Sequence, residues 1–331
     1  MNRLYAGLAS CLSIGLLLAA CGAPAAAPPT ATPAAVTYIR LPMGYIPNVQ
    51  YAPFYVAVEK SYFAQENIEV EFDYKFETDG VKLVGGNELE FALVSGEQVV
   101  LARSKGLPVV YVAAWFQDYP VAVVSKAAAG IEGPADLAGK TVGIPGLFGA
   151  SYVGWQALLD SAGLASEAAS LQEIGFTQVQ WLSEDQGDAA VVYTNNEPVQ
   201  LEAAGVPIHV IKVADYAHLA SNGLMSNEQT IAERPELVRG MVRAMLHGLA
   251  DTIAGPDEAF EICQKYVEGL AEADQATQKR VLAASIEMWR ADRLGYSDPA
   301  AWQNMNDLLV KAGLIPEAIE VEKAFTNEFV P

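Results

Sequence analysis

The sequence predicts an α/β fold, because short apolar runs alternate with longer segments of helical pattern. Strand-like runs rich in β-branched residues occur at residues 36–41, 91–94, 109–114, 121–124, 141–144, 189–193 and 206–213. They are apolar at consecutive positions, which fits strands covered on both faces, as in parallel sheets. Helix-like segments lie between them at residues 52–64, 96–105, 150–162 and 198–204. Gly106, Gly163 and Gly205 follow three of these segments, where helices commonly end.

The last third of the chain is predicted to be a helical region. Strand-like runs cease after about Ser221, and an apolar stripe at helical spacing consists of Leu237, Met241, Met245, Leu249 and Ile253. Residues 274–294 and 299–313 have the same character. We expect the two methionines of the stripe to pack in the core rather than to bind a soft metal, and Cys263 to be a buried apolar side chain. His247 falls off the stripe and is expected at the surface.

Composition and charge exclude one class of partner. The 331 residues are 52% hydrophobic and 18% charged, which is the composition of a chain that folds around a core. Forty acidic residues against 20 basic ones give a formal charge of −20, which repels phosphate backbones and anionic lipid surfaces. We therefore expect no nucleic-acid partner.

Residues 1–20 are predicted to be a secretion signal. A single cation, Arg3, precedes the apolar residues 12–20, which are about half of the ~20 residues that a membrane-spanning helix needs. The following Ala19-Ala20-Cys21-Gly22 resembles a bacterial lipobox, which implies cleavage before Cys21 and lipid on its sulfur and amino group. An ordinary signal peptide that happens to carry a cysteine is the alternative. Residues 22–35 are almost wholly Ala, Pro and Thr, so residues 21–35 are predicted to be a lipidated cysteine and an extended tether.

Cysteine and histidine usage removes two further kinds of site. Cys11 leaves with the signal and Cys21 would carry lipid, so the mature chain keeps only Cys263 and forms no intramolecular disulfide. With three histidines and one thiol, a His/Cys metal site is not expected. We expect neither a metal nor a cofactor.

Four segments carry a resemblance to a known family. They are residues 44–63 (GYIPNVQYAPFYVAVEKSYF), 90–97 (EFALVSGE), 136–146 (DLAGKTVGIPG) and 188–192 (DAAVV). In this order they resemble the NMT1/THI5-like group of solute-binding proteins, and the resemblance extends over nearly everything after the tether. It implies a two-lobed, periplasmic-binding-protein type II-like fold, with residues 36–117 and 218–331 in lobe 1 and residues 118–217 in lobe 2.

The same resemblance implies a role. A lipid anchor, a tether and a two-lobed receptor together describe the extracytoplasmic component of an ABC importer, held at the cell membrane by its lipid alone. Its partners would be the permease and its ATPase, and the receptor itself would be a monomer that performs no catalysis. Tight capture would follow from closure of the lobes over a small ligand.

Candidate binding loops follow the predicted strands, because ligands of open α/β sheets bind at the carboxyl ends of strands. The loops are residues 45–55, 94–98, 115–119, 145–152 and 193–197, and none of them contains Lys or Arg. A buried anion without such partners is costly, although a helix N-terminus can sometimes replace them. A neutral or weakly basic ligand is therefore expected.

Two kinds of side chain in these loops are candidates for contact with the ligand. The aromatic candidates, whose rings could stack on a flat heterocycle, are Tyr45, Trp115, Phe148, Tyr152 and Tyr193. The polar candidates, which could fix its orientation, are Asn48, Ser95, Glu97, Ser151, Asn195, Asn196 and Glu197. The alternatives are that half of the loop aromatics belong to the core, with Phe54 and Tyr55 foremost, that Ser151 caps a helix, and that Asn195 and Asn196 form a plain turn before Pro198.

Residues 148–152 and 193–198 look closest to the riboflavin-binding lipoproteins of filamentous phototrophic bacteria, which implies a flavin ligand. Thiamine-precursor pyrimidines are the alternative, and the arginine-free loops disfavour the alkanesulfonates bound by a sister branch. Eukaryotic relatives of this fold make a pyrimidine with an active-site histidine and a Cys-rich motif, which this chain lacks. A third alternative is a surface adhesion or scaffold protein, which would need neither an enclosed pocket nor an importer. The aromatic residues at the strand ends argue against it.

The lipidation prediction can be tested directly. Replacing Cys21 with Ser removes the sulfur that would carry the lipid, so the protein should move from the membrane fraction to the soluble fraction of the producing bacterium. A Cys263→Ser variant is the control and should stay with the membrane. Membrane retention of the Cys21→Ser variant would refute the anchor.

Overall fold

The computed structural model describes residues 35–331, so the predicted signal, Cys21 and nearly all of the tether lie outside the described residues. Strands are β1 Thr37–Pro42, β2 Ile68–Asp73, β3 Ala92–Val94, β4 Val109–Ala114, β5 Val121–Lys126, β6 Thr141–Ile144, β7 Ser170–Glu173, β8 Ala189–Tyr193, β9 Ile208–Lys212 and β10 Gly223–Asn227. Helices are α1 Ala52–Glu59, α2 Tyr62–Gln65, α3 Glu77–Gly85, α4 Gly96–Ser104, α5 Gly149–Ser161, α6 Gln178–Ser183, α7 Glu197–Ala203, α8 Glu228–Glu233, α9 Pro235–Ala254, α10 Pro256–Cys263, α11 Gln275–Trp289 and α12 Pro299–Lys311. The predicted α/β class is confirmed.

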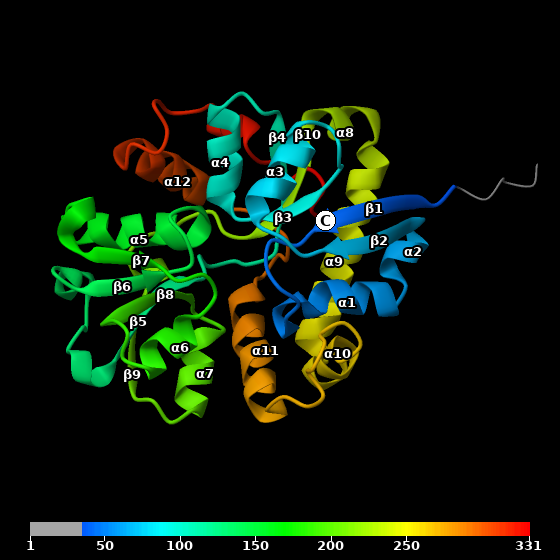
Figure 1. Ribbon diagram of the computed structural model, residues 1–331. Coiled ribbons are helices and arrows are strands. Elements are labelled where there is room, and N and C mark those ends of the chain that lie inside the picture. Colours follow the sequence, from blue (N-terminus) through cyan, green and yellow to red (C-terminus); the bar gives the residue numbers. More distant parts are fainter. Residues whose placement is uncertain (1–34) are drawn as a thin grey trace, which may run out of the picture. The chain divides into compact units, whose positions relative to one another are not determined.

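A five-stranded sheet takes the middle of the chain, in the order β7-β6-β8-β5-β9. Helix α5 covers one face, and α6 and α7 cover the other (Figure 1). The sheet is mixed, since β6 is parallel to β7 and β8 whereas β5 is antiparallel to β8 and β9. Consecutive apolar residues indicate that both faces of a strand are buried, but they do not indicate its direction. Strand β5 is antiparallel to its neighbours and is still buried on both faces, because helices cover both sides of the sheet.

A three-stranded sheet of order β3-β10-β4 and a parallel pair, β1 with β2, complete the sheets of the described residues. Strand β10 corrects the prediction that strands cease after Ser221. Its residues Gly223–Asn227 are buried and pair antiparallel with both neighbours. The segment carries no β-branched residue, so its sequence lacks the usual strand signal. Two crossovers, residues 115–120 and 213–222, connect the sheets on either side.

The predicted helix at residues 52–64 is in fact two helices. Helix α1 starts at Ala52 with Pro53 in its first turn, a favoured position for proline, and α2 begins after Ser61. Ser61 has φ +61°, a left-handed conformation that a continuous helix cannot contain. The turn lets α1 pack on α9 while α2 packs beside β2.

The helical C-terminal region behaves as its pattern predicts. Met241, Met245 and Leu249 are fully buried in the core between α1, α9 and α10, Cys263 is buried with them, and His247 is exposed. Helix α11 contacts α10 and also α7 of the five-stranded sheet. Within residues 35–331, no helix combines the length and the apolar character needed to cross a membrane.

The contact between α1 and α9 depends on Gly248. A Cβ at this position would lie 2.0 Å from the carbonyl oxygen of Pro53 and 2.9 Å from the Cβ of Ala57. Gly248→Ala should therefore lower the free energy of unfolding by about 1–3 kcal/mol, measured by chemical denaturation, because the helices must separate. Gly133→Ala is the control, since a Cβ there meets nothing within 4 Å. Equal stability of the two variants would show that the contact is loose.

Candidate functional site

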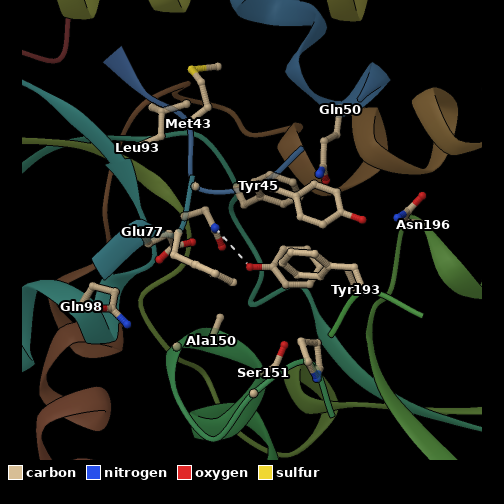
Figure 2. Close-up of a pocket in the computed structure, with 18 of the residues that line it drawn as sticks. Met43, Tyr45, Gln50, Glu77, Leu93, Gln98, Ala150, Ser151, Tyr193 and Asn196 are labelled. Carbon is tan, nitrogen blue, oxygen red and sulfur yellow. Dashed lines mark hydrogen bonds between the residues drawn. The ribbon is translucent and has the colours of Figure 1, made fainter. Parts of the chain in front are cut away.

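A cavity of about 930 Å³, including its open mouth, lies where loops from several sheets meet. The loops follow β1, β6, β7 and β8 at their carboxyl ends, and the start of α3 and both crossovers contribute further residues. Figure 2 shows Glu77 and Gln98 on one side of the cavity and Asn196 on the other. The location agrees with the general position of ligands in α/β sheets.

The structure brings together seven of the twelve side chains that the sequence singles out. The predicted residues that line the cavity are Tyr45, Trp115, Phe148, Ser151, Tyr193, Asn196 and Glu197. The predicted residues that do not line it are Asn48, Ser95, Glu97, Tyr152 and Asn195. Phe54 and Tyr55 are fully buried in the core, as the alternative for these two rings predicts.

The five remaining residues have identifiable positions. Asn48 accepts a hydrogen bond from the Gln50 backbone N–H at 3.0 Å and so caps a short 3-10 helix. Asn195 donates to the Ser285 hydroxyl at 2.7 Å and thereby ties β8 to α11. Tyr152 faces a neighbouring groove between α4 and α5. Ser95 and Glu97 do not line the cavity themselves, but Ser95 Oγ contacts both the lining residue Glu77 and Glu97.

Four aromatic rings close the mouth of the cavity from both sides. Tyr45 meets Phe176 edge-to-face with ring centroids 4.7 Å apart, and Phe76 meets Phe148 in the same way at 5.5 Å. The three phenylalanines are 42–50% exposed, which is unusual for such rings and marks an apolar rim. Tyr45 and Phe76 follow β1 and β2, whereas Phe148 and Phe176 follow β6 and β7, so the rim joins the two sides of the molecule.

Two carboxyl groups share one hydroxyl at the cavity wall. Glu77 Oε2 accepts hydrogen bonds from the Ser95 backbone N–H at 3.0 Å and from Ser95 Oγ at 2.6 Å. Ser95 Oγ also contacts Oε1 of Glu97, which is fully buried. Burial raises the pKa of both carboxyls, and for Glu97 the adjacent charge of Glu77 raises it further, to about 8.

A third carboxyl, Glu197, orients the amides on the opposite wall. Glu197 accepts from the Tyr193 backbone N–H and from the Asn196 side-chain N–H, both at 2.9 Å. Gln200 donates to Asn196 Oδ1 at 2.8 Å. Burial raises the pKa of Glu197 above its ordinary value. The Asn196 amide donates to Glu197 and accepts from Gln200, so these two hydrogen bonds fix the orientation in which Asn196 faces the cavity.

The cavity wall also carries polar atoms without a partner among the described residues. Within the described residues, the buried Trp115 Nε1 donates no hydrogen bond and the buried Asn222 Oδ1 accepts none. Asn222 donates instead to the Tyr193 hydroxyl at 3.3 Å, drawn as a dashed line in Figure 2. Burial, with nearby carboxylates second, raises the pKa of Tyr193 well above its ordinary value, so its phenol is neutral.

The described residues that line the cavity include no Lys and no Arg. Its ionisable lining groups are therefore carboxyls and phenols. Within residues 35–331, no group of three or more His, Cys, Asp or Glu side chains is arranged to hold a metal ion. The site is built to contact aromatic surface and to accept hydrogen bonds.

Sheets joined by two crossovers around such a cavity define a two-lobed, type II-like periplasmic solute-binding fold. The alkanesulfonate-binding protein SsuA of Xanthomonas axonopodis pv. citri, solved with MOPS bound, has this fold with a TM-score of 0.70 at 12% identity, over 89% of this chain and 99% of that protein. Residues 48–259 match the family described as NMT1/THI5 like, and the chain belongs to this family.

Two curated relatives are similar over nearly their whole length. The riboflavin-binding protein RibY of Chloroflexus aurantiacus is 42% identical over 96% of this chain and 95% of the relative. The formylaminopyrimidine-binding protein of Halalkalibacterium halodurans is 28% identical over 88% of this chain and 91% of the relative.

The buried carboxyls make stability depend on pH. A pKa raised in the folded state means that the folded protein binds more protons than the unfolded chain, so the contribution of Glu97 is present below about pH 4.5 and is lost as the pH rises to about 8. The melting temperature of the ligand-free protein should fall between about pH 5.5 and pH 8.5, and Glu97→Gln should flatten that fall. Glu202→Gln, at an exposed carboxyl, is the control. An unchanged slope in Glu97→Gln would show that Glu97 titrates normally.

Proposed function

We propose that this protein is the extracytoplasmic, lipid-anchored binding component of an ABC importer and that it captures riboflavin between its two lobes. The observation that carries the proposal is a roomy aromatic cavity whose ionisable lining groups are carboxyls and phenols, without a cation among the described lining residues. The similarity to a riboflavin-binding protein at 42% identity supports it.

The aromatic lining suits a three-ring flavin. Tyr45, Trp115, Phe148 and Tyr193 come from four different loops and face one cavity. Each stacking or edge-to-face contact with a flat ring adds about 0.5–1.5 kcal/mol beyond the burial of area. An isoalloxazine system is large enough to meet rings from several walls at once, whereas a single pyrimidine ring reaches fewer of them.

The polar lining suits the ring edge and the ribityl hydroxyls. Gln50, Gln178 and Asn196 offer amide donors and acceptors, and Glu77 and Glu197 accept from N–H or O–H groups. Riboflavin is uncharged and carries one ring N–H and several hydroxyls, so it supplies the donors that the carboxyls require.

We propose that lobe 1 consists of residues 36–117 and 218–331 and lobe 2 of residues 118–217. The β1-β2 pair and the three-stranded sheet then belong to lobe 1, and the five-stranded sheet belongs to lobe 2. Tyr45 and Phe76 of lobe 1 already contact Phe176 and Phe148 of lobe 2, so this rim would open to admit the ligand and close again to shield it. The monomeric receptor would then dock on a permease coupled to an ATPase, while lipid on Cys21, which lies outside the described residues, keeps it at the membrane. We propose no catalysis, and neither His209 nor His218 lines the cavity.

A thiamine-precursor pyrimidine is the second candidate. An aminopyrimidine has N–H donors and a weakly basic ring nitrogen, and both would suit a carboxyl such as Glu77. The formylaminopyrimidine-binding relative supports this candidate at a lower identity of 28%.

Titration of the soluble fragment with riboflavin tests the proposal. Flavin fluorescence should be quenched with a one-to-one endpoint, and saturating ligand should add about 3 kcal/mol or more to the free energy of unfolding. Tyr193→Ala should weaken binding about tenfold or more, since it removes a stacking ring and a hydroxyl. Tyr216→Ala, at an exposed ring outside the cavity, is the control. Unchanged emission, together with thermal stabilisation by hydroxymethylpyrimidine, would favour the second candidate.

A further inference from the structure

The Ser95 hydroxyl has two carboxyl oxygens within hydrogen-bond distance but only one proton to donate. Ser95 Oγ lies within hydrogen-bond distance of Glu77 Oε2 and of Glu97 Oε1. A serine hydroxyl has one proton and can donate to only one of two carboxylates. The other contact must then be donated by a carboxylic acid, so this pair of carboxyls retains one proton.

The geometry also indicates which carboxyl holds that proton. Glu77 Oε2 already accepts from the Ser95 backbone N–H as well as from its hydroxyl, and an oxygen that accepts twice is best occupied by a full negative charge. Glu97 is fully buried and, apart from the contact with Ser95 Oγ, accepts only long side-chain hydrogen bonds, from Gln98 at 3.4 Å and Tyr119 at 3.3 Å. The proton therefore belongs to Glu97, which donates to Ser95, which donates to Glu77.

The described residues that line the cavity around Glu77 include no cation. Glu97 on α4, Tyr51 after β1, Tyr119 before β5 and Tyr193 at the end of β8 all interact with its charge. The three phenols are neutral, because burial raises their pKa well above the ordinary value. Glu77 Oε1 makes no hydrogen bond within the described residues and belongs to a cavity-lining side chain. One ionised acceptor thus faces the ligand.

We propose that Glu77, held ionised by the donor chain from Glu97 through Ser95, determines specificity: it selects a ligand that places a hydroxyl or N–H group on its free oxygen and rejects the phosphorylated form of the same ligand. The inference rests on the proposed function and adds the chemical class that the site excludes. A phosphate or sulfonate offers only acceptors to Glu77 and brings a second negative charge into a cavity whose described lining has no cation.

Binding of riboflavin and of riboflavin 5′-phosphate to the wild type and to Glu77→Gln tests the selection. The wild type should prefer riboflavin about 100-fold or more. Glu77→Gln should bind riboflavin about tenfold more weakly, because a charge-assisted hydrogen bond is lost. Its preference for riboflavin over riboflavin 5′-phosphate should fall by about tenfold or more, because the repulsion between Glu77 and the phosphate is lost as well. Glu202→Gln should leave both affinities unchanged. Equal binding of the two flavins by the wild type, or an unchanged preference in Glu77→Gln, would overturn the proposal.

The pH dependence of binding gives a second reading. Protonation of Glu77 removes the acceptor, so riboflavin affinity of the wild type should fall as the pH is lowered through the titration of Glu77, and affinity of Glu77→Gln should not change with it. Parallel pH profiles would contradict the assigned role. If wild type binds neither riboflavin nor hydroxymethylpyrimidine, the proposed function itself fails.

The proton arrangement can be measured without any ligand. Infrared spectra of the ligand-free protein at neutral pH should contain a protonated-carboxyl C=O band that disappears in Glu97→Gln. In Glu77→Gln the loss of the neighbouring charge lowers the pKa of Glu97, so the same band should vanish at a lower pH than in the wild type. A band that persists in Glu97→Gln, or no such band in the wild type, would overturn the donor chain whatever the ligand is. Melting curves of each variant establish that it is folded.

Discussion

The site depends on the burial of carboxyl groups whose partners are hydroxyl and amide groups instead of cations. Ser95 sits at the turn between β3 and α4, where its backbone N–H and hydroxyl both reach Glu77 at the start of α3. The turn has little freedom, since a Cβ on Gly96 would lie 2.6 Å from both the Cβ and the carbonyl oxygen of Ala220 in the second crossover. The same packing that holds the crossover against α4 therefore fixes the polar end of the cavity.

The aromatic rim and the carboxyls have complementary roles. Edge-to-face contacts between rings have little directional preference beyond their tilt, so they shield the ligand and hold the lobes together without defining its chemistry. A buried carboxylate is selective, because any ligand that fails to donate to it leaves an unpaired charge in an apolar setting. Under the proposed function, shape and stacking would admit flat heterocycles, and Glu77 and Glu197 would select among them.

The sequence predicted the α/β class, the helical C-terminal region and the cavity residues that follow buried strands. Tyr193, Asn196 and Glu197 were found because β8 is apolar at consecutive positions. Phe76, Glu77 and Phe176 were missed because they follow β2 and β7, which lie at the edges of their sheets and carry polar residues on an exposed face. A search restricted to continuous apolar runs does not detect such strands, and therefore it also misses the loops that follow them in the sequence. Adjacent residues are also hard to separate by sequence: Asn195 points to α11 and Asn196 to the cavity, although both are asparagines in one turn.

In a chain with a formal charge of −20, the basic residues lie away from the cavity, whose described lining contains no Lys or Arg. Several cations join segments that are distant in sequence, such as Lys60 with Asp251, Arg243 with Glu66 and Arg234 with Glu90. These pairs are partly exposed, so each adds little to stability, but each keeps a long flexible cation on the outside of the lobes. Were one of these side chains able to reach Glu77, the pair would neutralise each other and the wall would lose its acceptor. Under the proposed function, the separation of surface cations from buried carboxyls is therefore a condition for recognising an uncharged donor, and it would disfavour a sulfonate or a phosphate.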